Sequence, residues 1–164
     1  MTAAVGTPRL GMSFALAAIA MMFLGLTSAL VVRQGLDPGW RAIPMPRLLL
    51  ANTLVLLASS VALEKARRAA GPWLAATVLL GLVFLTGQLI AWRDLAAQGL
   101  YLSNNPHAAF FYLLTGLHGL HLLGGLGALA FSAARRTWLE TTALYWHFMG
   151  ALWIYLFLLL FVWR

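Results

Sequence analysis

Three histidines in the C-terminal half are the side chains best suited to chemistry. His118 and His121 lie three positions apart, so they project from one side of a helix, about 60° from each other. His147 belongs to the next apolar stretch, and imidazoles from two neighbouring helices can hold a metal ion. Metal-bound imidazoles are usually oriented by carboxylates, and none of the 4 acidic residues lies inside an apolar stretch. We therefore expect the histidines to be structural groups and the chain to bind no metal, a metal site being the weaker alternative.

The sequence offers no other catalytic constellation. It contains no cysteine, which excludes disulfides, thiolate catalysis and cysteine-ligated metals. No glycine-rich phosphate loop follows a strand, and no serine or aspartate stands where a nucleophile with its base would need it. We expect no catalytic residue in this chain, which indicates a subunit of a larger assembly.

The composition is that of a polytopic membrane protein. Hydrophobic residues make up 62% of the chain and charged residues only 9%, which is not a soluble composition. The net charge of +7 comes from basic residues placed between apolar stretches. Anionic headgroups and the bias of positive charge towards the cytoplasm explain this placement, so no nucleic-acid partner is expected.

Five apolar stretches are long enough to cross a bilayer. They predict an all-α fold, a polytopic membrane helix bundle with five transmembrane helices in a single membrane domain that covers residues 1–164. A proline-rich connector follows the first stretch, and a basic turn over 64–71 follows the second. The sequence SNNPH before the fourth stretch suits a loop and a helix cap, with His107 at the surface. The predicted spans are approximately 11–32, 48–63, 73–92, 108–131 and 142–163.

Basic residues are clustered in two short turns, and this clustering predicts the orientation. Lys65, Arg67 and Arg68 lie in one turn, and Arg135 and Arg136 lie in the other. We therefore expect the N-terminus in the cytoplasm. Four of these side chains are candidates for contact with lipid headgroups: Arg67, Arg68, Arg135 and Arg136.

Polar side chains inside the second and third spans can join helices. In the second span, the side chains placed to bond to a neighbouring helix are Asn52, Thr53, Ser59 and Ser60. Gln88 is the one conspicuous polar residue of the third span. For the serines and the threonine, a bond to a carbonyl of their own helix is an equal alternative. The glycines of the fourth span are expected to allow close packing of helices.

Four segments, in order, resemble the cytochrome c oxidase subunit III family, which is subunit III of haem-copper terminal oxidases. Five spans, where seven occur in the long form, are similar to the short five-helix bacterial form that lacks the first two helices. The segments are IPMPRLLLANTLVLLASSVALEKARRA (43–69), GQLIAW (87–92), NNPHAAFFYLLTGLHGLHLLGG (104–125) and LYWHFMGALW (144–153).

This resemblance implies an accessory, non-redox subunit of a proton-pumping oxidase that passes electrons from cytochrome c to O2 in aerobic electron transport. It implies a multi-pass protein of the bacterial cytoplasmic (inner) membrane, packed beside catalytic subunit I in a complex with subunit II and other respiratory subunits. Haem and copper would belong to these partners, while this chain would hold phospholipid. The family's polar positions carry over as structural or lipid-contact candidates: His118, His121, His147, Gln88, Asn52, Ser59 and Ser60.

The chain departs from the family pattern in its acids. The family usually has a carboxylate within the span that here contains Ile19 and Ala20, a Glu where Ala91 stands and an Asp where Gly150 stands. A role for such carboxylates in proton handling is therefore not expected here. The residues name no electron donor, so the equivalent subunit of a quinol oxidase or nitric-oxide reductase stays an alternative. A small transporter or channel is disfavoured because no charged or broken helix lies at mid-membrane.

Overall fold

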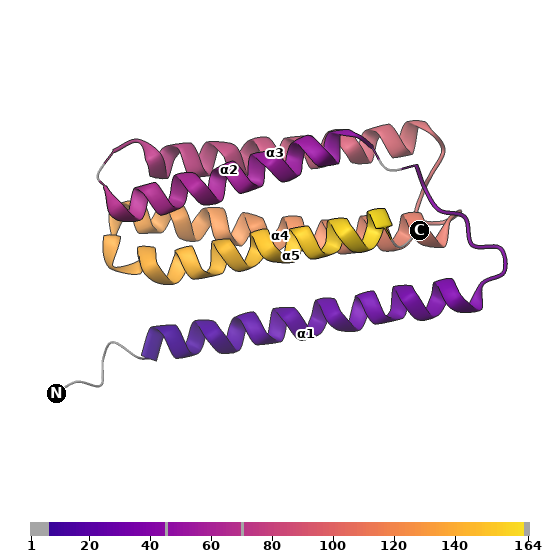
Figure 1. Ribbon diagram of the computed structural model, residues 1–164, viewed down its shortest axis with the longest axis horizontal. Coiled ribbons are helices and arrows are strands. Elements are labelled where there is room, and N and C mark those ends of the chain that lie inside the picture. The colour runs from indigo at the N-terminus through magenta and orange to yellow at the C-terminus, as the bar shows by residue number, and fades with distance from the viewer. Residues whose placement is uncertain (1–6, 45, 70, 163–164) are drawn as a thin grey trace.

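The computed structural model describes residues 7–44, 46–69 and 71–162, which form five long α-helices and one 3-10 turn. All five helices are long and apolar enough to cross a membrane, which confirms the predicted all-α membrane bundle. They run along one axis, with α2 and α3 in one layer, α4 and α5 in the next, and α1 on the outside (Figure 1). The elements are α1 (Thr7–Leu36), α2 (Leu48–Arg68), α3 (Trp73–Ala97), α4 (Pro106–Ala134), η1 (Arg136–Trp138) and α5 (Leu139–Val162).

The helices are longer than the spans predicted from apolar runs. The clearest difference is the predicted turn over 64–71, which is wrong because α2 continues to Arg68. Glu64 pairs with both Arg67 and Arg68 at helical spacing, and these pairs stabilise the last turn. The chain then reverses at Gly71, whose φ of 155° favours glycine. The fifth predicted span ends at Trp163, which lies outside the described residues.

The start of α4 shows the predicted cap and one error. The Asn105 side chain accepts a hydrogen bond from the Ala108 backbone N–H at 3.1 Å, and proline occupies the first helical position. His107, expected at the surface, is buried instead. Its Nδ1 accepts from the Ile43 N–H at 3.2 Å, and its ring stacks on Trp40 at 5.2 Å. The proline-rich connector folds back over the start of α4, and this contact is invisible in the local sequence.

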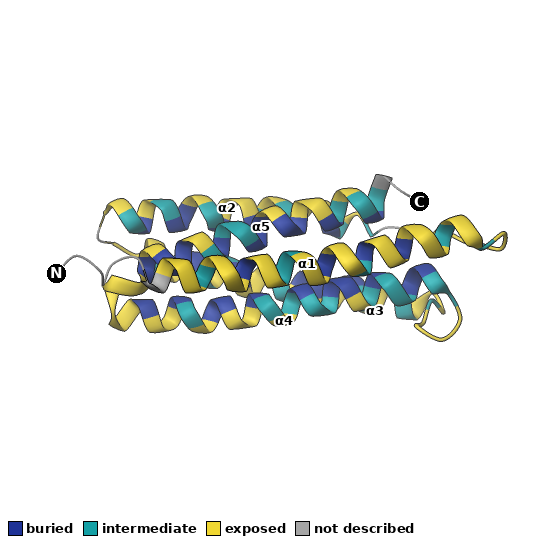
Figure 2. Ribbon diagram, turned by 90° about the horizontal axis from the view of Figure 1, so that it is seen from below, coloured by how far each residue is buried: buried dark blue, intermediate teal, exposed yellow. Residues whose placement is uncertain are grey.

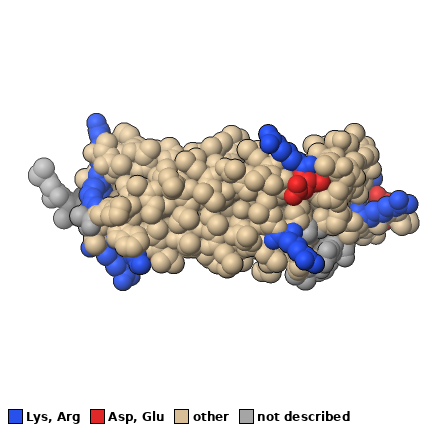
Figure 3. Space-filling model, turned by 90° about the horizontal axis from the view of Figure 1, so that it is seen from above, with Lys and Arg blue, Asp and Glu red and all other residues tan. Residues whose placement is uncertain are grey.

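Large apolar side chains fill the interior and also cover the outside of the bundle. Buried residues face inward between the helices, while the outer faces are exposed (Figure 2). Lysine, arginine and the acids gather towards the two ends, with an uncharged band between them (Figure 3). The outer band is where acyl chains or partner helices would lie. Among the fully buried side chains the largest are Trp146, Trp153, Phe23, Phe84 and Phe111.

Candidate functional site

Three rings from three helices meet in the interior, and we call Phe84, His118 and Trp153 the aromatic centre. The Phe84 and Trp153 rings are 4.8 Å apart in an edge-to-face arrangement. The His118 ring lies 5.2 Å from Trp153 and 5.9 Å from Phe84. Trp153 Nε1 also donates to Thr53 Oγ1 at 3.0 Å. Side chains from α2, α3, α4 and α5 therefore converge at one point of the bundle.

His118 is fully buried at this point, and its ring packs by its faces and edges. Within the described part of the chain, neither ring nitrogen has a hydrogen-bond partner. Gln88 lies one turn along α3 from Phe84 and is also buried. Neither polar atom of its side-chain amide has a hydrogen-bond partner in the described residues. Unpaired polar atoms are costly in an apolar surrounding. His118 is enclosed by the bundle itself, whereas Gln88 also lines a hollow between α3 and α4.

The structure separates the three histidines that the sequence analysis considered together. His121 Nδ1 donates to the Leu117 carbonyl at 2.7 Å, and its ring contacts Phe23 of α1 at 5.9 Å. His147 lies near the end of the bundle, with its Nε2 3.9 Å from Glu64 Oε2. His147 is six residues, about 9 Å along α5, from Trp153, whose ring contacts His118. Among the described residues, no three His, Cys, Asp or Glu side chains are grouped to hold a metal ion.

Three of the polar candidates in α2 bond across helices, and one of them is Thr53, which accepts from Trp153 of α5. Asn52 Nδ2 donates to the Phe84 carbonyl of α3 at 3.1 Å. Ser59 Oγ donates to the Thr77 carbonyl at 3.0 Å and accepts from Trp146 Nε1 at 3.2 Å. The open choice between the neighbouring helix and the own helix is thus settled for Ser59 in favour of the neighbour.

Glycines let these helices approach so closely. A Cβ on Gly81 would lie 2.8 Å from Trp146 Cη2, and a Cβ on Gly87 would overlap the Asn52 side-chain amide. Ser60 is half-buried, and its Oγ would be 3.5 Å from a Cβ on Gly150. The polar and small residues of the middle of the bundle therefore hold α2 against α3 and α5.

An ion-pair cluster of Glu64, Arg67, Arg68 and Glu140 closes one end of the bundle. Arg67 binds Glu140 with two hydrogen bonds, of 3.1 Å from Nε and 2.6 Å from Nη2, and binds Glu64 at 2.6 Å from Nη1. Arg68 Nε donates to the second oxygen of Glu64 at 3.0 Å. The cluster joins α2 to α5, and Arg9 of α1 lies 4.0 Å from Glu140. Sequence reasoning missed this cluster because Arg67 and Glu140 are 73 residues apart.

The four arginines predicted to contact lipid headgroups differ in their ion pairs and in their exposure. The Arg67 guanidinium already binds two carboxylates, whereas the Arg68 side chain is 77% exposed. Arg135 lies over the Phe131 ring at 5.4 Å, and Arg136 is exposed at the start of η1. Arg67 is thus held in ion pairs within the chain, while Arg68, Arg135 and Arg136 are exposed.

Residues 7–164 match the protein family described as cytochrome c oxidase subunit III. The chain belongs to this family. It is 31% identical to cytochrome c oxidase subunit 3 of Synechocystis sp., over 93% of this chain and 74% of that protein. It is 33% identical to the subunit 3 of Thermostichus vulcanus, over 93% of this chain and 86% of that protein. The probable subunit 3 of Mycobacterium bovis is 32% identical over 72% of this chain and 64% of its own length.

As a member of the cytochrome c oxidase subunit III family, the chain is an accessory subunit of a haem-copper oxidase, and so of an oxidoreductase complex. Two positions where the family resemblance suggests acids are filled by small residues in the interior. Ala91 is fully buried in the core, and Gly150 is buried beside Ser60. In this subunit III chain these two positions serve packing, and no carboxylate is present there to titrate.

Proposed function

We propose that this chain supports a proton-pumping terminal oxidase, which passes electrons from cytochrome c to O2, without carrying a redox centre itself. It would pack beside catalytic subunit I, in a complex with subunit II, and hold phospholipid around that contact. Haem and copper would belong to the partners. The proposal rests on two features taken together. Ring contacts, hydrogen bonds and ion pairs join the helices to one another, and the outer faces of the bundle are apolar. Leu54, Leu79 and Leu120, for example, are each more than 60% exposed.

The interior contacts support a scaffold more than a reaction site. The aromatic centre and the ion-pair cluster fix four helices relative to one another, and the residues in them contact each other. A rigid bundle with apolar faces can fix the position of a neighbouring subunit and order the lipid next to it. Chemistry would then reside in the neighbour, and this chain would protect the surroundings in which it occurs.

We expect removal of this chain to shorten the working life of the oxidase while leaving its initial rate close to that of the intact complex. The reason is that the redox centres stay in place but lose the protein and lipid that shield them. The measurement compares oxygen consumption per haem during sustained turnover, with and without the subunit, at equal detergent and lipid content. Addition of the purified subunit should restore the working life. Loss of the initial rate with the haem spectrum intact would contradict the scaffold role.

We also propose the bacterial cytoplasmic membrane as the location, with the N-terminus on the cytoplasmic side. The ends of α2 and α4 that carry the clustered basic residues lie at the same end of the bundle as Arg9, as the contacts of Arg9 and Arg67 with Glu140 indicate. Clusters of this kind favour the cytoplasmic side. The connector between α1 and α2 would then face the outside.

Single cysteines at positions 68 and 41 should report opposite sides of the membrane. Arg68→Cys is expected to react with an impermeant maleimide only after the cytoplasmic face is opened, and Arg41→Cys in intact spheroplasts. Both positions are exposed, and the chain has no native cysteine, so the unsubstituted protein is the background control. Reaction of position 68 from outside, with position 41 protected, would reverse the orientation.

A further inference from the structure

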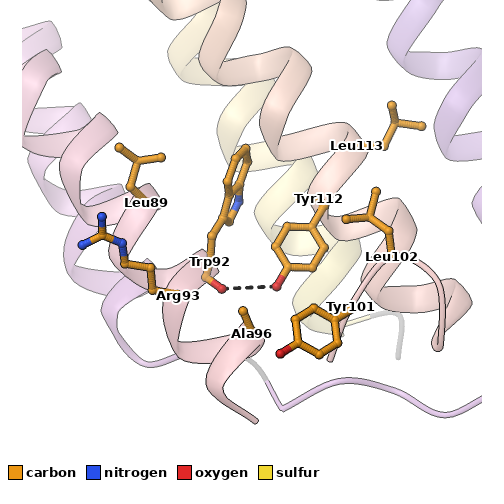
Figure 4. Close-up of a pocket in the computed structure, with 8 residues that line it drawn as sticks. All are labelled: Leu89, Trp92, Arg93, Ala96, Tyr101, Leu102, Tyr112 and Leu113. Carbon is orange, nitrogen blue, oxygen red and sulfur yellow. Dashed lines mark hydrogen bonds between the residues drawn. The ribbon is translucent and has the colours of Figure 1, made fainter. Parts of the chain in front are cut away.

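An apolar groove runs between α3 and α4 on the outside of the bundle. It consists of two adjoining hollows of about 600 Å³ and about 280 Å³ that share Leu89 and Trp92 in their walls. Binding pockets for small molecules commonly have volumes of ~300–1,000 Å³, so the space is sufficient for a ligand. In the larger hollow, Leu89 and Arg93 lie on one side and Leu102 and Leu113 on the other, with the Trp92 and Tyr112 rings between them (Figure 4).

The larger hollow opens at the end of the bundle where α3 leaves the apolar band, and its rim is basic. Arg93 lines it and is exposed, and it makes no ion pair with any residue in the described ranges. Tyr101 is exposed beside it. The Tyr112 hydroxyl lies 3.2 and 3.1 Å from the Trp92 and Leu100 carbonyls, between which it shares its one proton, and this fixes the ring in the wall. The rim therefore offers an unpaired positive charge to a ligand.

The smaller hollow lies deeper in the apolar band and has an unpaired amide in its lining. Gln88 is 3% exposed, and neither its Oε1 nor its Nε2 has a partner in the part of the chain that the structure describes. Gly116 and Gly119 of α4 form part of the opposite wall, and they leave room where side chains would otherwise stand. A polar group buried in this way is costly unless a ligand supplies the missing hydrogen bond.

We propose that this α3/α4 groove binds one anionic diacyl phospholipid from the bilayer. Its phosphate would lie at Arg93, an ester carbonyl would accept from Gln88 Nε2, and an acyl chain would cover Gly116 and Gly119. Gln88 is five residues before Arg93, about 7.5 Å deeper along α3. The inference rests on the proposed lipid-holding function and gives it a particular site.

The order of chemical groups along the groove favours a phospholipid over a partner helix. A cation stands at the membrane surface, a hydrogen-bond donor lies about one and a half turns below it, and apolar surface follows. A phospholipid presents its phosphate, its ester carbonyls and its acyl chains in the same order. An apolar helix of a partner would fill the hollows but leave the buried amide unpaired.

The test uses the tagged chain purified from its membrane together with whatever it assembles with, stripped of lipid by detergent exchange. The haem spectrum and the companion subunits of this preparation test the proposed function. Native mass spectrometry during titration with palmitoyl-oleoyl-phosphatidylglycerol tests the groove separately, because lipid is counted on this chain after its release in the gas phase. Palmitoyl-oleoyl-phosphatidylcholine and a diether phosphatidylglycerol, which lacks the ester carbonyls, are the comparison lipids.

We expect one phosphatidylglycerol per chain to bind in preference to phosphatidylcholine. Arg93→Gln should weaken its binding about tenfold and remove that preference, whereas Arg47→Gln, at an exposed arginine on the same side of the membrane, should not. Gly119→Leu should abolish binding by filling the groove. Gly127→Leu is its control, because a Cβ on Gly127 meets nothing within 4 Å.

The role of Gln88 has its own measurement. The diether lipid should bind the unsubstituted chain about fivefold more weakly than the diester, and Gln88→Leu should erase this difference. Gln98→Leu, at the exposed glutamine that follows the end of α3, should leave it unchanged. Equal binding of phosphatidylglycerol and phosphatidylcholine would overturn the proposal. So would a photo-crosslinker at position 120 that joins a companion subunit instead of lipid, because the groove would then be a protein interface.

Discussion

Replacement of Trp153 by alanine is expected to lower the stability of the bundle by about 3–5 kcal/mol, the range for a large buried aromatic side chain. Trp153 is 1% exposed and contacts rings from α3 and α4. Its removal would leave a cavity at the point where four helices converge and would leave Thr53 Oγ1 without its donor. The loss should therefore affect the whole bundle instead of one helix end.

Unfolding of the purified subunit in mixed micelles, driven by increasing SDS and followed by circular dichroism, measures this loss. Trp153→Phe keeps a ring in the centre but loses the Nε1–H, so it should fall between the alanine variant and the unsubstituted chain. Trp138→Ala is the matched control because that side chain is 45% exposed. Similar midpoints for the Trp138 and Trp153 alanine variants would show that the aromatic centre does not hold the bundle together.

The substitution Gly87→Ala, which adds a single methyl group, is expected to lower the stability of the bundle by about 1–3 kcal/mol, the usual range for overpacking a close contact. The added Cβ would be 2.7 Å from Asn52 Cγ, so the amide would have to move away. The movement would also break its hydrogen bond to the Phe84 carbonyl. Gly87→Ala is therefore expected to push α2 away from α3 at the Asn52 contact, although alanine is the better helix former.

The same SDS unfolding assay, applied as a double-mutant cycle, isolates this cause. Asn52→Ala should remove the overlap, so the second substitution Gly87→Ala should cost much less in that background than alone. Gly127→Ala is the control for helix propensity and should be neutral or stabilising, because it faces open space. If Gly87→Ala lowers the stability equally with and without the Asn52 side chain, overlap with Asn52 is not the cause of the loss.

Composition and periodic spacing predict the elements of this chain well, because helices of this length and hydrophobicity have few other environments. The local signals at Asn105 and Pro106 also predict the start of α4, since a cap depends on neighbours in sequence. The end of α2 was missed for the converse reason. The charged residues from Glu64 to Arg68 look like a turn after an apolar run, but their ion pairs extend the helix beyond it.

The contacts that decide roles could not be predicted because they join residues distant in sequence. His107 follows a loop signal, yet the connector that covers it lies 64 residues earlier. Arg67 looks like a free surface charge until α5 brings Glu140 to it. Gln88 stood out as a polar residue in an apolar span, but only the neighbouring glycines of α4 show that it borders a groove. Residue types in the sequence were enough to select the candidate residues. The contacts that each of them makes depend on how the helices pack.

The position of α1 has a consequence for the biogenesis of the protein. α1 packs against α4 and α5, through the hydroxyls of Thr27 and Tyr155 at 2.8 Å and the rings of Phe23 and His121. Synthesis begins at the N-terminus, so α1 enters the membrane before either partner exists. It must stay in lipid by its own hydrophobicity, without these two partners, while α2 and α3 pack against each other. Among the five described helices, α1 is therefore inserted earliest but packed only once α4 and α5 have followed.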